Sequence, residues 1–289
     1  MHGLNREHAA TAPSRVDLSS PRRLVVAPRD IPCLPANIDR LRRLAASNEA
    51  SPAALERAIA ADLGFTTRVL AAANSPFYGC SGQIDSIRGA ITLLGATQIR
   101  AIARALAEAP PWECPHAPAL WLHALATAQW TRVITRHLQL PDVPYLFTAG
   151  MMHDIGLILL LRKIPEIAST FVELTRDRRG SWPQLEQERV RPDHSVIAAQ
   201  ACRAWQLPET LVRTIASHHR HEDGNLEGSV LMLADALAQA IGFGEFADLP
   251  RLSRDEIAAM VELNTDIEEL LAQGPRVRQD VQAISGAVS

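Results

Sequence analysis

The chain has 289 residues, enough for one large or two modest domains with a hydrophobic core. Hydrophobic residues make up 47% of it but aromatic residues only 4%, so the core must consist of Leu, Ile, Val and Ala, which favours helices packed on helices. The formal net charge of -3 excludes a general electrostatic attraction for nucleic acid or anionic lipid. Four scattered cysteines without CxxC spacing, and an N-terminus without an apolar signal segment, lead us to expect a cytoplasmic protein.

Composition divides the chain into successive parts. Residues 1–30 lack periodicity and are rich in Arg, Ser, Pro and Ala, so we expect a mobile arm, with the apolar residues 24–26 docking on the fold. The proline-rich stretch 108–118 is typical of a linker or hinge. We therefore expect an N-terminal helical half over 31–107, a second half over 116–241 and a C-terminal helical extension over 242–289.

In the N-terminal half, the spacing of apolar side chains predicts five short helices. Ser51-Pro52 is typical of a helix start, and Gly64 of the end of that helix. Gly95 closes the fourth helix and separates it from the fifth. Two helices around a glycine also resemble a helix-turn-helix, but the acidic net charge and the lack of a dense basic face argue against DNA binding. We expect a structural helical hairpin.

The second half has longer helical patterns, with helices expected over 119–138, from Asp193, from Pro208 and over 229–241. Capping boxes beginning at Ser181, Ser253 and Thr265 predict three more helix starts. No segment shows sustained alternation of apolar and polar residues. The predicted fold class is therefore all-α, with essentially no sheet.

The most apolar run, residues 143–161, contains one adjacent ionisable pair, His153 and Asp154. Its length would suit a membrane span. An Asp at the centre of a span, however, costs roughly 2.5–3.5 kcal/mol, and the other predicted helices are amphipathic. We therefore expect a buried central helix in a soluble protein, whose His and Asp side chains need a partner such as a cation.

A metal ion is one partner that would satisfy this pair. Helical periodicity places His123 on the apolar side of its helix and Asp235 on a face that should be buried. Imidazoles and carboxylates together bind Zn, Fe, Mn or Ni. Each of these residues alone is more simply read as a satisfied core residue. Together with His153 and Asp154, they make a shared metal site a serious alternative.

The order of His123, His153-Asp154 and Asp235 resembles the H…HD…D signature of the HD-domain superfamily of metal-dependent phosphohydrolases. The chain is most similar to the HDOD branch, and the similarity runs from Leu34 to His219. The residues that carry it include Leu34-Pro35, Ala73-Asn74-Ser75-Pro76-Phe77, Ser86-Ile87, Leu94-Gly95, the HDIG segment at 153–156, Trp205-x-Leu207-Pro208 and His218-His219. The resemblance implies an HD-like helical bundle with an additional N-terminal helical half, over residues 31–241.

The resemblance also implies site residues and a cofactor. His123, His153, Asp154 and Asp235 match the ligands of the basic HD metal site. His194, His218 and His219 match positions that hold a second metal in the HD-GYP branch, which cleaves cyclic-di-GMP. The cofactor implied is one or two divalent ions, Fe, Mn, Zn or Ni. Three departures bear on activity: Leu157 replaces a phosphate-binding lysine, Leu226-Glu227-Gly228 replaces Gly-Tyr-Pro, and Ala119 replaces an acidic ligand.

HDOD proteins are bacterial signalling modules for which hydrolytic activity has generally not been established. We therefore expect a non-catalytic or weakly catalytic regulatory protein that contacts another signalling protein and senses a metal or nucleotide ligand. The alternative is a metal-dependent phosphohydrolase acting on a nucleotide or cyclic dinucleotide, in which the metal makes a hydroxide and Asp154 orients it. We expect neither a membrane nor nucleic acid as a partner.

Overall fold

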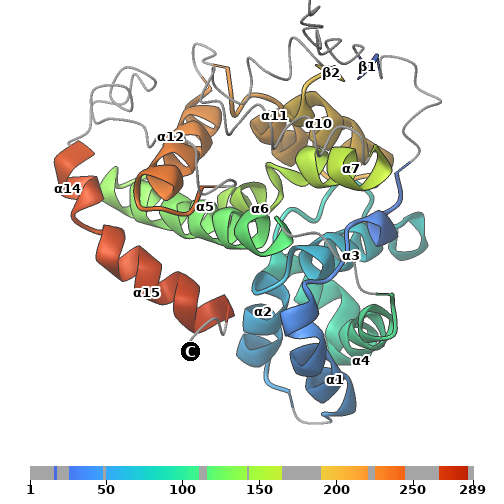
Figure 1. Ribbon diagram of the computed structural model, residues 1–289. Helices are drawn as coiled ribbons and strands as arrows, with labels where there is room; N and C mark the ends of the chain where they lie inside the picture. Colours follow the sequence, from blue (N-terminus) through green and yellow to red (C-terminus); the bar gives the residue numbers. More distant parts are fainter. Residues whose placement is uncertain are drawn as a thin grey trace, which may run out of the picture.

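The computed structural model describes residues 16–17, 26–47, 50–110, 116–141, 143–164, 190–220, 225–244 and 267–285. Helices dominate this part of the chain, which confirms the all-α class (Figure 1). The only strands within it are β1 (Val16–Asp17) and β2 (Val190–Arg191), which pair in parallel. This short pairing is the one exception to the expected absence of sheet.

The N-terminal half is a cluster of helices at the lower right of Figure 1. Its elements are the 3-10 turns η1 (Pro28–Asp30), η2 (Pro35–Asn37) and η3 (Pro76–Tyr78) and the helices α1 (Ile38–Ala46), α2 (Pro52–Ala60), α3 (Leu63–Ala73) and α4 (Ile87–Ala107). The Ser51 hydroxyl accepts a hydrogen bond from the Ala54 amide, so α2 begins where predicted. The predicted break at Gly95 is also confirmed, since its φ of 68° kinks α4.

The prediction that Gly64 ends α2 is wrong. Helix α2 ends at Ala60, and Asp62 caps the next helix by accepting a hydrogen bond from the Phe65 amide at 2.9 Å. Gly64 lies in the first turn of α3, where a Cβ atom would stand 2.4 Å from the Pro32 carbonyl oxygen. Close approach of two backbones, and not helix termination, requires glycine here.

The second half is built around one long helix, α5. The helices α6, α12 and α15 pack against it, and α10 packs against α7 and α11. The bounds are α5 (Ala117–His137), α6 (Pro144–Met152), α7 (Ile155–Lys163), α10 (His194–Ala204), α11 (Glu209–Ala216), α12 (Leu226–Ala240), α14 (Ile267–Leu271) and α15 (Gly274–Ser285). Leu, Ile, Val and Ala dominate the buried core, as the composition predicts.

The apolar run over 143–161 is not the single continuous helix that we expected. Helix α6 ends at Met152 and α7 begins at Ile155, so His153 and Asp154 lie in the turn between two helices. The break turns α7 onto the start of α10, where a Cβ atom on Gly156 would stand 1.9 Å from the His194 carbonyl oxygen. Tertiary packing of α7 on α10 therefore overrides a helical pattern that is continuous in sequence.

The same region is the one stretch in the described part of the chain that is long and apolar enough to cross a membrane. It runs from Pro144 to Lys163, and 89% of its most apolar window is buried inside the protein. Burial of this extent is consistent with the core of a soluble protein.

Contacts between distant segments hold the two halves together. Helix α3 packs against α6, and the Lys163 ammonium lies 3.0 Å from the Asp30 carboxylate. Val26, from the segment expected to dock, accepts a hydrogen bond from the Trp205 indole at 3.1 Å. The predicted capping boxes at Ser181, Ser253 and Thr265, the rest of the arm and the central part of the hinge lie outside the described residues.

Candidate metal centre

The structure brings all seven predicted metal ligands together at the centre of the second half. The first group consists of His123 from α5, His153 from the turn after α6, and Asp235 from α12. The Nε2 atom of His123 lies 3.1 Å from Asp235 Oδ1 and 3.2 Å from His153 Nε2. These three residues come from segments far apart in the sequence, so only the packing of α5 against α6 and α12 assembles them.

The second group consists of Asp154, His194, His218 and His219. Asp193 caps α10, and this fixes His194 at the first turn of that helix. The Nε2 atom of His194 lies 3.3 Å from that of His218 and 2.9 Å from that of His219. His218 and His219 follow the end of α11, and His219 is the most exposed of the seven residues.

Asp154 connects the two groups through its two carboxylate oxygens. Oδ2 lies 2.9 Å from His153 Nε2 and 3.4 Å from His123 Nε2. Oδ1 faces the other way, 3.1 Å from His194 Nε2 and 3.6 Å from His218 Nε2. One carboxylate therefore presents one oxygen to each group, which is the arrangement that bridges two metal ions.

The imidazole tautomers can be inferred from the backbone around the rings. The Nδ1 atoms of His123, His153 and His218 lie 2.5, 2.8 and 2.6 Å from the carbonyl oxygens of Phe243, Gly150 and Ile215. A carbonyl oxygen only accepts, so each Nδ1 must donate, and in the neutral ring Nε2 keeps its lone pair. Such second contacts orient metal-binding histidines in general.

The donor set fits divalent cations. Lone pairs on Nε2 atoms and negative carboxylates converge within 4.8 Å of one another in each group. Acceptors that face each other in a buried site are unfavourable unless a cation lies between them. With bound ions, His123, His153, Asp154 and Asp235 would hold one, and Asp154, His194, His218 and His219 the other. The ligand types suit Fe, Mn, Zn or Ni.

The electrostatics favour the protonation states that bind metal. Burial lowers the pKa of His218 and of His219, and neighbouring histidines lower the pKa of His219 further, so both rings stay neutral. Burial by itself would raise the pKa of Asp235, but the hydrogen bond and charge of His123 outweigh it and hold that pKa below its usual range. Neutral imidazoles and ionised carboxylates are the ligand forms that metals require.

A model of the HDOD domain family matches residues 31–221 of the chain. The protein belongs to the HDOD family. Two solved structures share its fold: a response regulator, MmoQ, from Methylococcus capsulatus (23% identity, TM-score 0.65, 83% of this chain and 97% of that one) and a virulence factor from Campylobacter jejuni (21% identity, TM-score 0.65, 87% and 94%).

An uncharacterised protein of Treponema pallidum is 20% identical to this HDOD protein over 193 residues, which are 66% of this chain. The match spans only 38% of that relative's length. The chain therefore matches only part of that longer protein.

The residues that depart from catalytic HD proteins lie close to the metal ligands. Leu157, at the position usually held by lysine, is fully buried in the first turn of α7. Ala119, at the position of an acidic ligand, lies in the first turn of α5. Leu226 and Gly228 form the first turn of α12. This HDOD protein thus combines the seven predicted ligand residues, without the acidic one at position 119, with an apolar side chain where a phosphate-binding charge would lie.

Sequence reasoning missed the residues that support the ligands. The carbonyl of Gly150 lies one turn before His153, and a search of helix spacings could have found it. The carbonyl of Phe243 is 120 residues from His123, and no local signal points to it. Two further histidines, His116 and His137, are partly exposed and lie outside the cluster, and His221 is not among the described residues.

Proposed function

We propose that the protein is a regulatory HDOD module that holds a binuclear divalent-metal centre and acts by contact with another signalling protein in the cytoplasm. The observation that carries the metal part is the position of Asp154, with one carboxylate oxygen directed to each group of histidines. Four of the seven ligands come from His194 to Asp235 and three from His123 to Asp154. A bound metal would therefore tie the two parts of the bundle together.

Two features support a regulatory role over turnover. The first is Leu157, whose apolar side chain cannot bind a phosphate group. The second is burial, because His123, His153, His194 and His218 have no exposed surface and Asp154 is only 2% exposed. A substrate would have to reach ligands that the described part of the chain already covers. Metal held in this way stabilises one arrangement of helices, which a partner can recognise.

Contact with a protein partner is supported by an exposed aromatic ring. Phe77, in the turn η3, is 85% exposed, although large apolar side chains are usually buried. The chain's net charge of -3 gives no corresponding support for a nucleic-acid partner. Phe77 is thus the residue at which we place the contact with the signalling partner.

The second candidate function is metal-dependent phosphohydrolysis, and the convergence of the seven predicted ligand residues favours it. Metal ions bound there would lower the pKa of a water molecule and polarise a phosphoryl oxygen. Asp154 would orient that water through its carboxylate. Position 157 offers no cationic side chain, so binding of the substrate phosphate would depend on the metal.

Elemental analysis of protein purified without chelator or affinity metal tests the proposal. We expect about two equivalents of Fe, Mn, Zn or Ni in the wild type, a loss of metal in His153→Ala, and no loss in His137→Ala. His137 lies on α5 like His123 but outside the cluster, so it controls for the loss of any histidine. Metal-free wild-type protein would refute the metal centre.

A second assay separates the two functions. The metal-loaded wild type is incubated with bis(p-nitrophenyl) phosphate and with cyclic-di-GMP, and released product is measured against His153→Ala. We expect the wild type to release no more product than the His153→Ala variant. Turnover that requires His153 would establish the phosphohydrolase instead, and Leu157→Lys would then be expected to raise it.

A further inference from the structure

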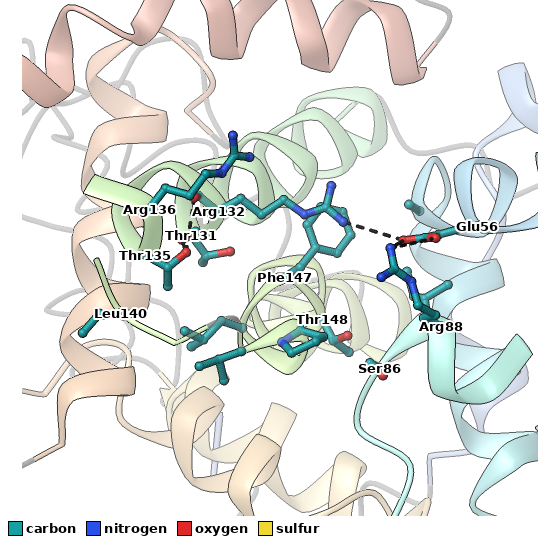
Figure 2. Close-up of a pocket in the computed structure, with 15 residues that line it drawn as sticks. Glu56, Ser86, Arg88, Thr131, Arg132, Thr135, Arg136, Leu140, Phe147 and Thr148 are labelled. Carbon is teal, nitrogen blue, oxygen red and sulfur yellow. Dashed lines mark hydrogen bonds and ion pairs between the residues drawn. The ribbon is translucent and has the colours of Figure 1, made fainter. Parts of the chain in front are cut away.

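A cavity of about 540 Å³ lies between the two halves, separate from the metal centre (Figure 2). Helices α2 and α4 of the N-terminal half form one wall, and α5 and α6 of the second half form the other. The lining residues used below are Glu56, Arg88, Arg132, Arg136, Phe147 and Thr148. Its volume is within the range of roughly 300–1,000 Å³ that is typical of small-molecule sites.

The cavity has a positive lining in a chain of negative net charge. Three arginines and one glutamate are its charged residues, which gives a local charge of about +2 by the sign of each side chain, against -3 for the whole chain. Glu56 lies 3.3 Å from the Arg88 guanidinium and 4.0 Å from that of Arg132. The Glu56 carboxylate thus lies beside two arginines, one from each half of the protein. These three side chains together carry one excess positive charge.

Arg132 is held in place by an aromatic ring. Its guanidinium carbon lies 3.9 Å from the centroid of the Phe147 ring, and Figure 2 shows the side chain extending over this ring towards Glu56. A guanidinium stacked in this way keeps its edge N–H groups available to an anion. The site is therefore organised before any ligand binds.

A buried hydroxyl provides a second, independent observation. The Thr148 side chain is fully buried and lines the cavity, yet its Oγ1 atom has no hydrogen-bond partner in the described part of the chain. Buried hydroxyl groups in native proteins nearly always have a partner. Rotation of the Thr148 side chain towards the opening would let an acceptor oxygen on a molecule in the cavity supply it.

We propose that this cavity binds a phosphate-bearing small molecule of nucleotide size. Arginine recognises phosphate oxygens with paired N–H groups, and a hydroxyl donates well to the same oxygens. The amino end of α4, beginning at Ile87 beside Ser86, adds partial positive charge to the wall. Positive lining, a preformed guanidinium and a buried donor together select an anion over a neutral molecule.

The location gives this ligand a way to act on the metal centre. Helix α5 carries both Arg132 and the metal ligand His123, and α6 carries Thr148 and leads directly into His153. Arg88, on the other wall, belongs to the N-terminal half. A ligand that bridges these walls would favour one relative position of the halves and of the helices that bear the metal ligands.

Calorimetric titration with ADP and with inorganic pyrophosphate tests the inference, with adenosine as the uncharged control. The protein is the full chain carrying His153→Ala, so that phosphate coordination to a bound metal does not contribute. We expect saturable binding of ADP and pyrophosphate and none of adenosine. No saturable binding of either phosphate compound would overturn the proposal.

Three variants locate the binding. Arg132→Gln and Thr148→Val should each weaken ADP binding by about tenfold or more, because hydrogen bonds to a charged acceptor are among the strong ones. Arg104→Gln changes an exposed arginine on α4 outside the cavity and should leave the affinity unchanged. Thr148→Val keeps the side-chain shape, so a preserved melting temperature with lost affinity excludes misfolding. Unchanged affinity in both cavity variants would contradict the inference.

Discussion

The Nε2 atoms of His123 and His153 lie 3.2 Å apart. Both Nδ1 atoms are directed at backbone carbonyl oxygens, so both Nε2 atoms face each other beside the Asp154 and Asp235 carboxylates. A divalent cation bound between these nitrogen and oxygen atoms would stabilise the arrangement. The metal content and the stability of the protein should therefore change together.

Single substitutions should show that the metal centre consists of two sites, because each site can lose its ion separately. His219→Ala removes a ligand from one group and Asp235→Asn from the other, so each variant should retain about half of the wild-type metal. Asp154→Asn affects the bridge and should lose both ions. Plasma mass spectrometry of the purified variants measures this. Equal loss in all three variants would show that the two groups do not act as separate sites.

Removal of metal should lower the melting temperature. A ligand at one hundred times its dissociation constant stabilises the folded state by about 2.7 kcal/mol. For a domain of 150–250 residues this corresponds to a shift of several degrees, since about 1 kcal/mol moves the midpoint by roughly 2–4 °C. Calorimetry with and without EDTA measures the shift. His153→Ala should melt at the same temperature in both buffers, and a chelator effect that persists there would have another source.

Gly156→Ala should disrupt the contact between α7 and α10. The added Cβ atom would stand 1.9 Å from the His194 carbonyl oxygen and 2.9 Å from the Ala198 nitrogen, and neither backbone atom can move without shifting α10. We expect a loss of at least about 2 kcal/mol in urea unfolding, together with reduced metal content because His194 moves. Gly89→Ala is the matched control. Its nearest neighbour is the Ser86 hydroxyl at 3.1 Å, and its stability should change by less than about 1 kcal/mol.

Asp62→Ala should be among the most destabilising substitutions in the N-terminal half. The buried carboxylate accepts hydrogen bonds from the Phe65 amide at 2.9 Å, the Leu34 amide at 2.9 Å and the Asn37 side chain at 2.9 Å. Its removal leaves buried donors without an acceptor, at roughly 1–3 kcal/mol for each group. Ser51→Ala removes an exposed helix cap and should cost only about 1 kcal/mol. Equal midpoints in urea for the two variants would contradict this account.

The helical class and many of the helix starts could be predicted from the sequence, because both depend on neighbouring residues. The cap at Ser51, the break at Gly95 and the start of α10 after Asp193 are confirmed as predicted. Family membership was also predictable, because the HDIG segment and its companions occur in a fixed order. Gly64 was misread, since a glycine that ends a helix and one that admits another backbone look the same in sequence.

The sequence by itself also predicted which side chains would hold a metal: seven histidines and aspartates with spacing similar to that of HD proteins. The tertiary structure alone decided how they meet. Only the packing of α5 against α6 and α12 brings His123 to Asp235, and only the break between α6 and α7 aims the two oxygens of Asp154 at different groups. The cavity with Arg88 and Arg132 likewise exists only where the halves join. Local spacing determines the helices, whereas contacts between distant residues determine the site.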